Sequence, residues 1–246
     1  MNSDLVKFLG TDFDFIDSGF SNGEENMRFD TDRKDAFYAG NAKPMFRIYG
    51  WKPWCVSLGF NQKESDIDRE RCEARGIEIV RRPTGGRAVL HADEITYSVV
   101  CGMPPGISPQ DLYRDIHIFL LSALHELGLK EVGFQKSQPD FRNMYRSEER
   151  SVACFASSAR WEIESNGKKL IGSAQRAFGS TLLQHGSILL DSGHDQLADI
   201  IAGSTDDKRE SLKEWTRRHS VTATEIAGRK ITYEEAAAAF RKVADL

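Results

Sequence analysis

The sequence has only four cysteines in 246 residues, and none of them lies in a C-x-x-C pair. They are Cys55, Cys72, Cys101 and Cys154, with no histidine at the spacing of a metal ligand. Zinc sites use such close spacings, and disulfide frameworks are typical of small secreted chains that are rich in cysteine. We therefore expect free thiols in a reducing compartment and no metal site.

The chain also lacks a long apolar run and an excess of basic charge. No apolar stretch approaches the length that crosses a membrane. The first residues, MNSDLVKFLGTDFDF, carry acidic side chains where a secretory leader would be basic and then apolar. The formal net charge is -4, whereas a dedicated nucleic-acid binder is usually basic. The sequence thus predicts a cytoplasmic protein with no membrane or nucleic-acid partner.

The composition is that of a folded globular protein. Hydrophobic residues make up 40% of the chain and charged residues 28%, which is enough to bury a sizeable core. Strand patterns dominate up to residue 192, and helix-forming, charged sequence follows. We therefore predict a core over 1–192 and a C-terminal helical layer of the same domain over 193–246.

Local patterns predict an alternation of strands and helices. Apolar alternation and turn residues indicate strands over 13–18, 45–49, 55–60 and 182–190, and an Asn166-Gly167 hairpin turn. Caps and helical periodicity indicate helices over 22–38, 66–75, 110–127, 198–202, 209–215 and 233–243. His117 and His125 lie on the helix predicted over 110–127 without a charged partner, so both are expected to be structural or surface residues.

The stretch from Ile77 to Cys101 is the most informative part of the chain. An apolar run breaks at Pro83-Thr84-Gly85-Gly86 and resumes in a segment whose alternation predicts a half-buried strand. The glycines leave backbone N–H groups bare, and arginines at 81, 82 and 87 flank them. Such a turn suits a bound carbonyl, carboxylate or phosphate, although a hairpin with solvated arginines fits the same spacing.

Two side chains further along could perform covalent chemistry. Cys154 precedes a predicted strand, and a thiolate is a good nucleophile near neutral pH. Lys169 is followed by the small residues Gly172, Ser173 and Ala174, which leave room for a substrate. A lysine there could bind an oxyanion, exchange a proton with a thiol or neutralise a phosphate. An inert core cysteine and a solvated lysine are the ordinary alternatives.

Three sequence blocks together carry a resemblance to a known family. RRPTGGRAVLHADEITYSVV resembles the signature of the biotin/lipoate protein ligase and lipoyl/octanoyl transferase family. A second block, K-x-x-G-S-A-Q followed by LQHGSILL, is similar to another family motif. A third and weaker match is F-I-D-S-G with Asn26, Met27 and Asp30 downstream. The blocks occur in the family's order and span most of the chain, from Phe15 to Asp191.

The resemblance implies an α/β fold in which helices flank a mixed sheet, like that of class II aminoacyl-tRNA synthetases and biotin/lipoate ligases. A tunnel for an acyl chain is expected in that fold. The resemblance implies that Lys169 contacts the acyl carbonyl. The residues that it implies for substrate binding are Arg82, Thr84, Gly85, Gly86, Arg87, His91, Gly172, Ser173 and Ala174.

Within the family, the sequence is most similar to the cysteine-dependent octanoyltransferase branch. ATP-using lipoate ligases usually have a third glycine where this chain has Arg87, and Cys154-Phe155 precedes the strand that leads to Lys169. The implied reaction moves an octanoyl or lipoyl group from acyl carrier protein to Cys154. The group then passes to a lysine of a lipoyl-carrier protein, such as the glycine cleavage H protein or an E2 lipoyl domain. This route needs no cofactor, and a monomer is expected.

Two alternatives remain open from the sequence. One is an ATP- and Mg²⁺-dependent lipoate–protein ligase in which Cys154 is a bystander. The other is a non-catalytic module that binds carrier proteins. In either enzyme, the arginines near Cys154 could dock an acidic carrier, although a solvated loop is the more ordinary explanation for such a cluster. These arginines are Arg142, Arg146, Arg150 and Arg160.

Overall fold

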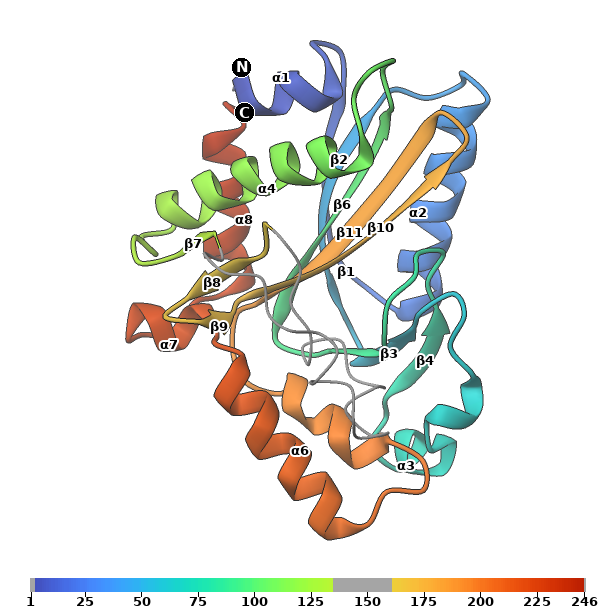
Figure 1. Cartoon of the computed structure of the whole chain (residues 1–246), viewed down its shortest axis with the longest axis vertical. Helices are drawn as coiled ribbons and strands as arrows, with labels where there is room; N and C mark the ends of the chain where they lie inside the picture. The colour runs from blue at the N-terminus through green and yellow to red at the C-terminus, as the bar shows by residue number, and fades with distance from the viewer. Residues whose placement is uncertain (1–2, 135–160, 246) are drawn as a thin grey trace.

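The computed structural model describes residues 3–134 and 161–245 (Figure 1). Cys154 and the four arginines proposed for carrier docking lie outside the described residues. The largest element is a five-stranded sheet with the strand order β1-β2-β6-β11-β10. Its strands are β1 (Asp14–Ser21), β2 (Met45–Trp51), β6 (Glu94–Gly102), β10 (Ile171–Phe178) and β11 (Thr181–Leu189).

The sheet is mixed, as the family resemblance implied. β1 pairs with β2 in parallel, and the remaining neighbours pair antiparallel. β1 and β10 form the two edges, so the predicted edge strand near residue 13 is confirmed. The order brings strands from three distant parts of the sequence side by side at the centre of the molecule.

Helices cover both faces of this sheet (Figure 1). α1 (Ser3–Leu9), α4 (Pro109–Glu126) and α8 (Tyr233–Val243) pack on one face, and α2 (Gly23–Tyr38) packs on the other. Phe46 of β2 contacts Phe119 of α4 edge-on at 4.9 Å, and Phe240 of α8 completes the same buried cluster. The C-terminal helix therefore shares the main core, while the division of the chain at residue 192 stays a prediction.

Two predicted helices form for the capping reasons that the sequence contains. Asn22 accepts a hydrogen bond from the Glu25 N–H at 2.9 Å and begins α2. Ser108 and Asp111 form a reciprocal capping box at the start of α4, and Pro109 occupies the first turn. Both helices end within one residue of the predicted positions.

The stretch around the Gly-Gly turn is not a hairpin. β4 (Glu78–Arg81) and β5 (Val89–His91) both pair with β3 (Cys55–Leu58), in the order β4-β3-β5. β4 is parallel to β3, and β5 is antiparallel to it. The hairpin prediction was wrong because the chain crosses over β3 through the turn instead of folding back on β4. The turn thus lies across the end of β3.

The prediction that β6 is half-buried was also wrong. Its polar residues Glu94, Thr96 and Ser98 are as buried as the apolar residues that alternate with them. β6 is the middle strand of the sheet and is covered on both sides. The polar face therefore points into an internal network of hydrogen bonds rather than into solvent.

The remaining elements surround these two sheets. A third, small sheet is formed by β7 (Gly133–Phe134), β8 (Ile163–Ser165) and β9 (Lys168–Lys169), and the predicted Asn166-Gly167 turn joins the last two. The remaining helices are 3₁₀ turns at Glu64–Asp66 and His194–Ile200, with α3 (Arg69–Ala74), α6 (Asp206–His219) and α7 (Ala223–Ala227). In the described residues, no helix is both long and apolar enough to span a bilayer, and Cys55, Cys72 and Cys101 are free thiols.

Candidate functional site

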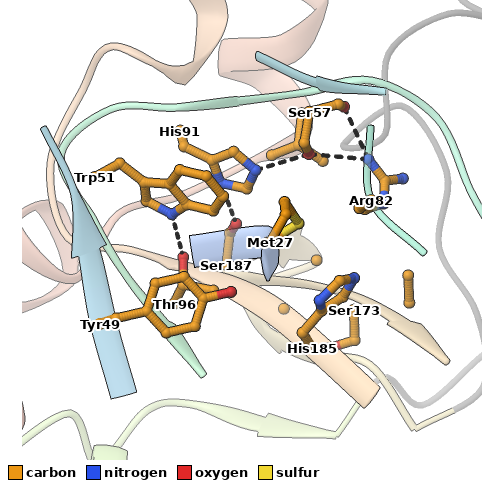
Figure 2. Close-up of a pocket in the computed structure, with 14 residues that line it drawn as sticks. Met27, Tyr49, Trp51, Ser57, Arg82, His91, Thr96, Ser173, His185 and Ser187 are labelled. Atoms are coloured by element: carbon orange, nitrogen blue, oxygen red, sulfur yellow. Dashed lines mark hydrogen bonds between the residues drawn. The ribbon is translucent and has the colours of Figure 1, made fainter. Parts of the chain in front are cut away.

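A pocket lies between the large sheet, α2 and the small β4-β3-β5 sheet (Figure 2). Its wall is formed by Met27, Tyr49, Trp51, Ser57, Arg82, Val89, His91, Thr96, Gly172, Ser173, Ala174, His185, Gly186 and Ser187. Five of the predicted site residues are therefore brought together there: Arg82, His91, Gly172, Ser173 and Ala174. They come from two separate sequence blocks, which meet at this pocket only in the folded chain.

Arg82 braces the turn over the pocket. Its guanidinium donates to the carbonyl oxygens of Gly85 at 2.9 Å, Arg87 at 2.6 Å and Ser57 at 2.9 Å. The residue is only 4% exposed, so these bonds form in a weakly solvated environment. Substrate binding by Arg82 was a prediction from sequence, and the structure shows this additional role in holding the backbone.

Gly86 and Gly59 let two backbone segments touch. Gly86 has a φ of +90°, a conformation that side chains disfavour, as the glycine pair suggested. A Cβ on Gly59, at the end of β3, would lie 1.9 Å from the Gly86 carbonyl oxygen. The glycine at 59 is therefore required by the close approach of the turn. Gly85 has no such constraint.

A buried acid–histidine pair holds Thr84. The Thr84 hydroxyl lies 2.6 Å from His185 Nε2, and His185 Nδ1 lies 3.4 Å from the Asp30 carboxylate. Arg47 donates to Asp30 at 2.9 Å. Burial lowers the pKa of His185, while the His185 hydrogen bond and the Arg47 charge lower the pKa of Asp30 against the opposing effect of burial. A neutral His185 that donates from Nδ1 accepts the hydroxyl hydrogen of Thr84 at Nε2.

A second acid–histidine pair lies on the other side of the pocket. His91 Nδ1 is 2.8 Å from Glu94 Oε1, and His91 Nε2 is 2.8 Å from the Ser57 hydroxyl, which also accepts from Arg82 at 3.1 Å. Trp51 stacks on the His91 ring at 3.9 Å (Figure 2). His185 thus holds the turn through a direct hydrogen bond to Thr84, and His91 holds it through the Ser57 hydroxyl, which bonds to Arg82.

Lys169 lies in β9 and forms a buried ion pair. Its Nζ is 2.6 Å from Glu162 Oε1, and both side chains are at most 7% exposed. Lys169 is not among the residues that line the pocket, although Gly172 and Ser173 follow it closely in the chain. Cys154 lies outside the described residues, so its distance from Lys169 is still a prediction.

Several residues of the site were not predicted as site residues from the sequence. Arg47 carried no motif that marked it, and Asp30, Glu94, His185 and Ser187 occurred only as parts of family blocks. Glu94, Thr96 and Ser98 are the polar residues that alternate with apolar ones in β6. This alternation could have marked them, but their side chains were expected to face solvent. His117 is structural, as predicted, but it is completely buried and bonds to the Ser173 hydroxyl at 3.0 Å.

The match to a known family extends over nearly the whole chain. The model of the lipoyl protein ligase A/B catalytic domain matches residues 22–244. The chain belongs to this family. In the described ranges 3–134 and 161–245, no group of three or more potential metal ligands accompanies the site.

Curated relatives of this lipoyl ligase-family chain are octanoyltransferases. The octanoyltransferase LipM of Geobacillus kaustophilus is 36% identical over 232 residues, which cover 93% of this chain and 83% of the relative. LipM of Moorella thermoacetica is 37% identical, with 88% of this chain and 79% of the relative covered. These relatives identify the chain as an acyltransferase of protein lipoylation, and the non-catalytic alternative is set aside.

Solved structures agree on the fold. A lipoate-protein ligase A bound with ATP has a TM-score of 0.65 and 19% identity, covering 94% of this chain and 82% of that chain. The bipartite lipoate protein ligase of Thermoplasma acidophilum has a TM-score of 0.66 and 18% identity, covering 93% and 80%. At these identities the likeness confirms the predicted ligase-type fold.

Proposed function

We propose that this chain takes octanoate from octanoyl-acyl carrier protein and transfers it to a lysine of a lipoyl-carrier protein through an acyl-Cys154 thioester. The observation that carries the proposal is the similarity to LipM octanoyltransferases over about nine-tenths of the chain. The acceptor classes are the glycine cleavage H protein and the E2 lipoyl domains. A cytoplasmic location and a monomeric state remain part of the same proposal.

The first step exchanges one thioester for another. The Cys154 thiolate forms a bond to the octanoyl carbonyl carbon, and the bond from that carbon to the pantetheine sulfur breaks. The electron pair leaves with the pantetheine thiolate, which takes up a proton. Lys169 and N–H groups of the Gly85-Gly86 turn stabilise the oxyanion that develops on the carbonyl oxygen.

The second step forms the amide. The neutral ε-amine of the carrier lysine attacks the acyl-Cys154 carbonyl carbon, the carbon–sulfur bond breaks, and the proton lost from nitrogen is taken up by the released cysteine sulfur. A thioester is already activated relative to an amide, so neither step requires ATP.

The pocket is suited to an apolar acyl chain. Met27, Val89 and the aromatic faces of Tyr49 and Trp51 supply its apolar wall, while the polar atoms of Thr96 and Ser187 bond to neighbouring protein groups. Gly172 and Ala174 keep the β10 wall free of large side chains. The Gly85-Gly86 turn lies nearby, where a carbonyl at the end of the chain would reach its backbone.

The test is intact-protein mass spectrometry after mixing the chain with octanoyl-acyl carrier protein in the absence of ATP. We expect an added octanoyl mass that survives denaturation, is removed by hydroxylamine and does not form on Cys154→Ala. Addition of an apo lipoyl domain should discharge the adduct and leave an octanoyl mass on the domain. Cys55→Ala is the matched control, because Cys55 is a completely buried thiol whose pKa burial raises.

The alternative is an ATP-dependent lipoate–protein ligase. It predicts no adduct from octanoyl-acyl carrier protein and incorporation of free lipoate only when ATP and Mg²⁺ are present. Transfer by Cys154→Ala at the wild-type rate would also refute the covalent route. Arg87, which stands where ATP-using relatives usually have a third glycine, supports the transferase.

A further inference from the structure

The backbone next to the Glu162–Lys169 ion pair is strained. Trp161 directly precedes Glu162 and has a φ of +70°, which is an outlier for a bulky residue. Such conformations persist only where the surrounding structure holds them, and they occur preferentially at functional sites. The contacts that hold Trp161 include its ring, which packs edge-on against Phe134 at 5.7 Å, and its carbonyl oxygen, which accepts a hydrogen bond from His117 Nδ1 at 2.7 Å.

The hydrogen of His117 can be assigned from its partners. A backbone carbonyl only accepts, so Nδ1 carries the hydrogen that bonds to Trp161. Burial lowers the pKa of His117 to about 3, so the ring is neutral and its Nε2 is an acceptor. The Ser173 hydroxyl lies 3.0 Å from Nε2 and 2.7 Å from the Tyr97 hydroxyl, which in turn accepts from the Gln184 amide at 2.8 Å. The hydrogen bond from His117 to the Trp161 carbonyl is therefore the last in a series of hydrogen bonds that begins at Gln184 and Tyr97 in the large sheet.

This network directs Glu162 toward Lys169. The positive φ at Trp161 sets the direction of the chain at Glu162, which directly precedes β8 and accepts from Lys169 of β9 at 2.6 Å. Glu162 accepts a hydrogen bond from the Lys169 ammonium group, which can only donate. An ammonium paired in this way is a hydrogen-bond donor and cannot also be a proton acceptor, which favours oxyanion binding over proton exchange with a thiol.

We propose that Glu162 and His117 are positioning residues for Lys169: Glu162 orients the lysine as a hydrogen-bond donor, and His117 holds the strained Trp161 peptide that aims Glu162. The inference rests on the proposed function, because it assigns Lys169 to the acyl-transfer step. It goes further by choosing between the roles that a lysine could have there.

Other titratable groups lie around the pair in the described part of the chain, and one of them, Glu164, pairs directly with Lys169 across the β8–β9 ladder. They are His117 on α4, Tyr97 on β6, Glu164 on β8, Lys168 on β9 and Arg217 on α6. The lowered pKa of His117 and the raised pKa of Tyr97 keep both neutral between about pH 5 and 9. Glu164 is half-buried, and the Arg217 side chain is 57% exposed and bonded to Asp195.

The first test is the pH dependence of octanoyl transfer by Glu162→Gln. This variant keeps the shape of the side chain and removes its charge, so the buried ammonium loses the carboxylate that lies 2.6 Å from it. The loss of one nearby opposite charge should move the high-pH limb of the rate profile down by about one to three pH units. Glu162→Asp keeps the charge and should keep the position of the limb.

A second test isolates the backbone. His117→Phe should slow transfer about tenfold, because the Trp161 peptide loses the hydrogen bond that holds it. Trp161→Gly in the His117→Phe background should restore most of the rate, because glycine adopts a positive φ without penalty. Trp161→Ala in the same background also removes the indole ring, but it should not restore the transfer rate. His125→Phe, on the same helix, is the matched control for loss of a histidine.

The outcomes separate this inference from the function on which it rests. Competitive acetylation of Lys169, followed by peptide mass mapping from pH 6 to 10, measures the charge of the lysine without turnover. Enhanced labelling near neutral pH in Glu162→Gln supports the proposal, and an unchanged labelling or rate profile overturns it. Equal recovery by the glycine and alanine variants also overturns the role of His117. Absence of an octanoyl adduct on the wild-type chain would instead refute the proposed function.

Discussion

The substitution Gly59→Ala tests whether the Gly85-Gly86 turn must touch the end of β3. The new Cβ would lie 1.9 Å from the Gly86 carbonyl oxygen and 2.8 Å from its carbon. Ordinary van der Waals contact begins at 3.4 Å, so the turn must retreat by about 1.5 Å from its position in the folded chain. Backbone cannot rotate away as the end of a flexible side chain can.

The retreat should affect activity more than stability. Forcing an extra methyl into a packed contact costs typically ~1–3 kcal/mol. For a chain of this size, each ~1 kcal/mol lowers the melting temperature by roughly 2–4 °C. The Thr84 carbonyl accepts a hydrogen bond from the Phe60 N–H at 2.9 Å, and Thr84 moves with the turn. The N–H groups that are proposed to bind the oxyanion move in the same way. A displacement of ~1 Å can cost about 100-fold in rate.

The assay is single-turnover octanoyl transfer together with thermal unfolding monitored by circular dichroism. Gly133→Ala is the matched control, because Gly133 has no positive φ and a Cβ added there would meet no atom within 4 Å. We expect Gly59→Ala to lose most of its activity while still unfolding cooperatively, and Gly133→Ala to behave as the wild type does. Wild-type transfer by Gly59→Ala would refute the reasoning that the turn is held in place by this contact.

Other consequences of the site can be measured on the same protein. Arg47→Met leaves the completely buried Asp30 carboxylate without the Arg47 cation and should lower the free energy of unfolding by ~3–5 kcal/mol in urea titrations. The control is Arg229→Met, which removes an ion pair at the surface and should leave the urea midpoint nearly unchanged. Stability should fall as the pH drops below about 6.5, because the lowered pKa values of His117 and His185 mean that the unfolded chain binds more protons there. The lowered pKa of Asp30 adds a loss of the same sign below about pH 4. A melting temperature that stays constant from pH 7 to 4 would contradict the two histidine assignments, and one that stays constant below pH 4 would contradict the assignment of Asp30.

Local sequence was sufficient to predict most of the elements. The caps at Asn22 and Ser108, the alternation in β11 and the Asn166-Gly167 turn act over a few residues, so their signals are visible without the rest of the chain. The same is true of the glycine at 86, whose positive φ follows from a turn motif. The family blocks added the fold, because they occur in order over most of the chain.

The pairing of the strands could not be predicted in this way. β3 inserts between β4 and β5, which are its later neighbours in sequence, and the turn that joins them crosses its end. Nothing in the alternation of Ile77 to Cys101 distinguishes this arrangement from a hairpin, since both bury the same faces. Which strands pair depends on long-range contacts between complete sheets.

The sequence by itself determined the chemical groups of this protein: a bare glycine turn with arginines, a lysine followed by small residues, and a candidate cysteine nucleophile. Only the tertiary structure decided what those groups do. Arg82 turned inward to the carbonyls of its own turn, Lys169 paired with Glu162, and the histidines at 117 and 185 became neutral through burial. Charge, hydrogen-bond direction and strain depend on desolvation and on partners distant in sequence, and these exist only once the chain has folded.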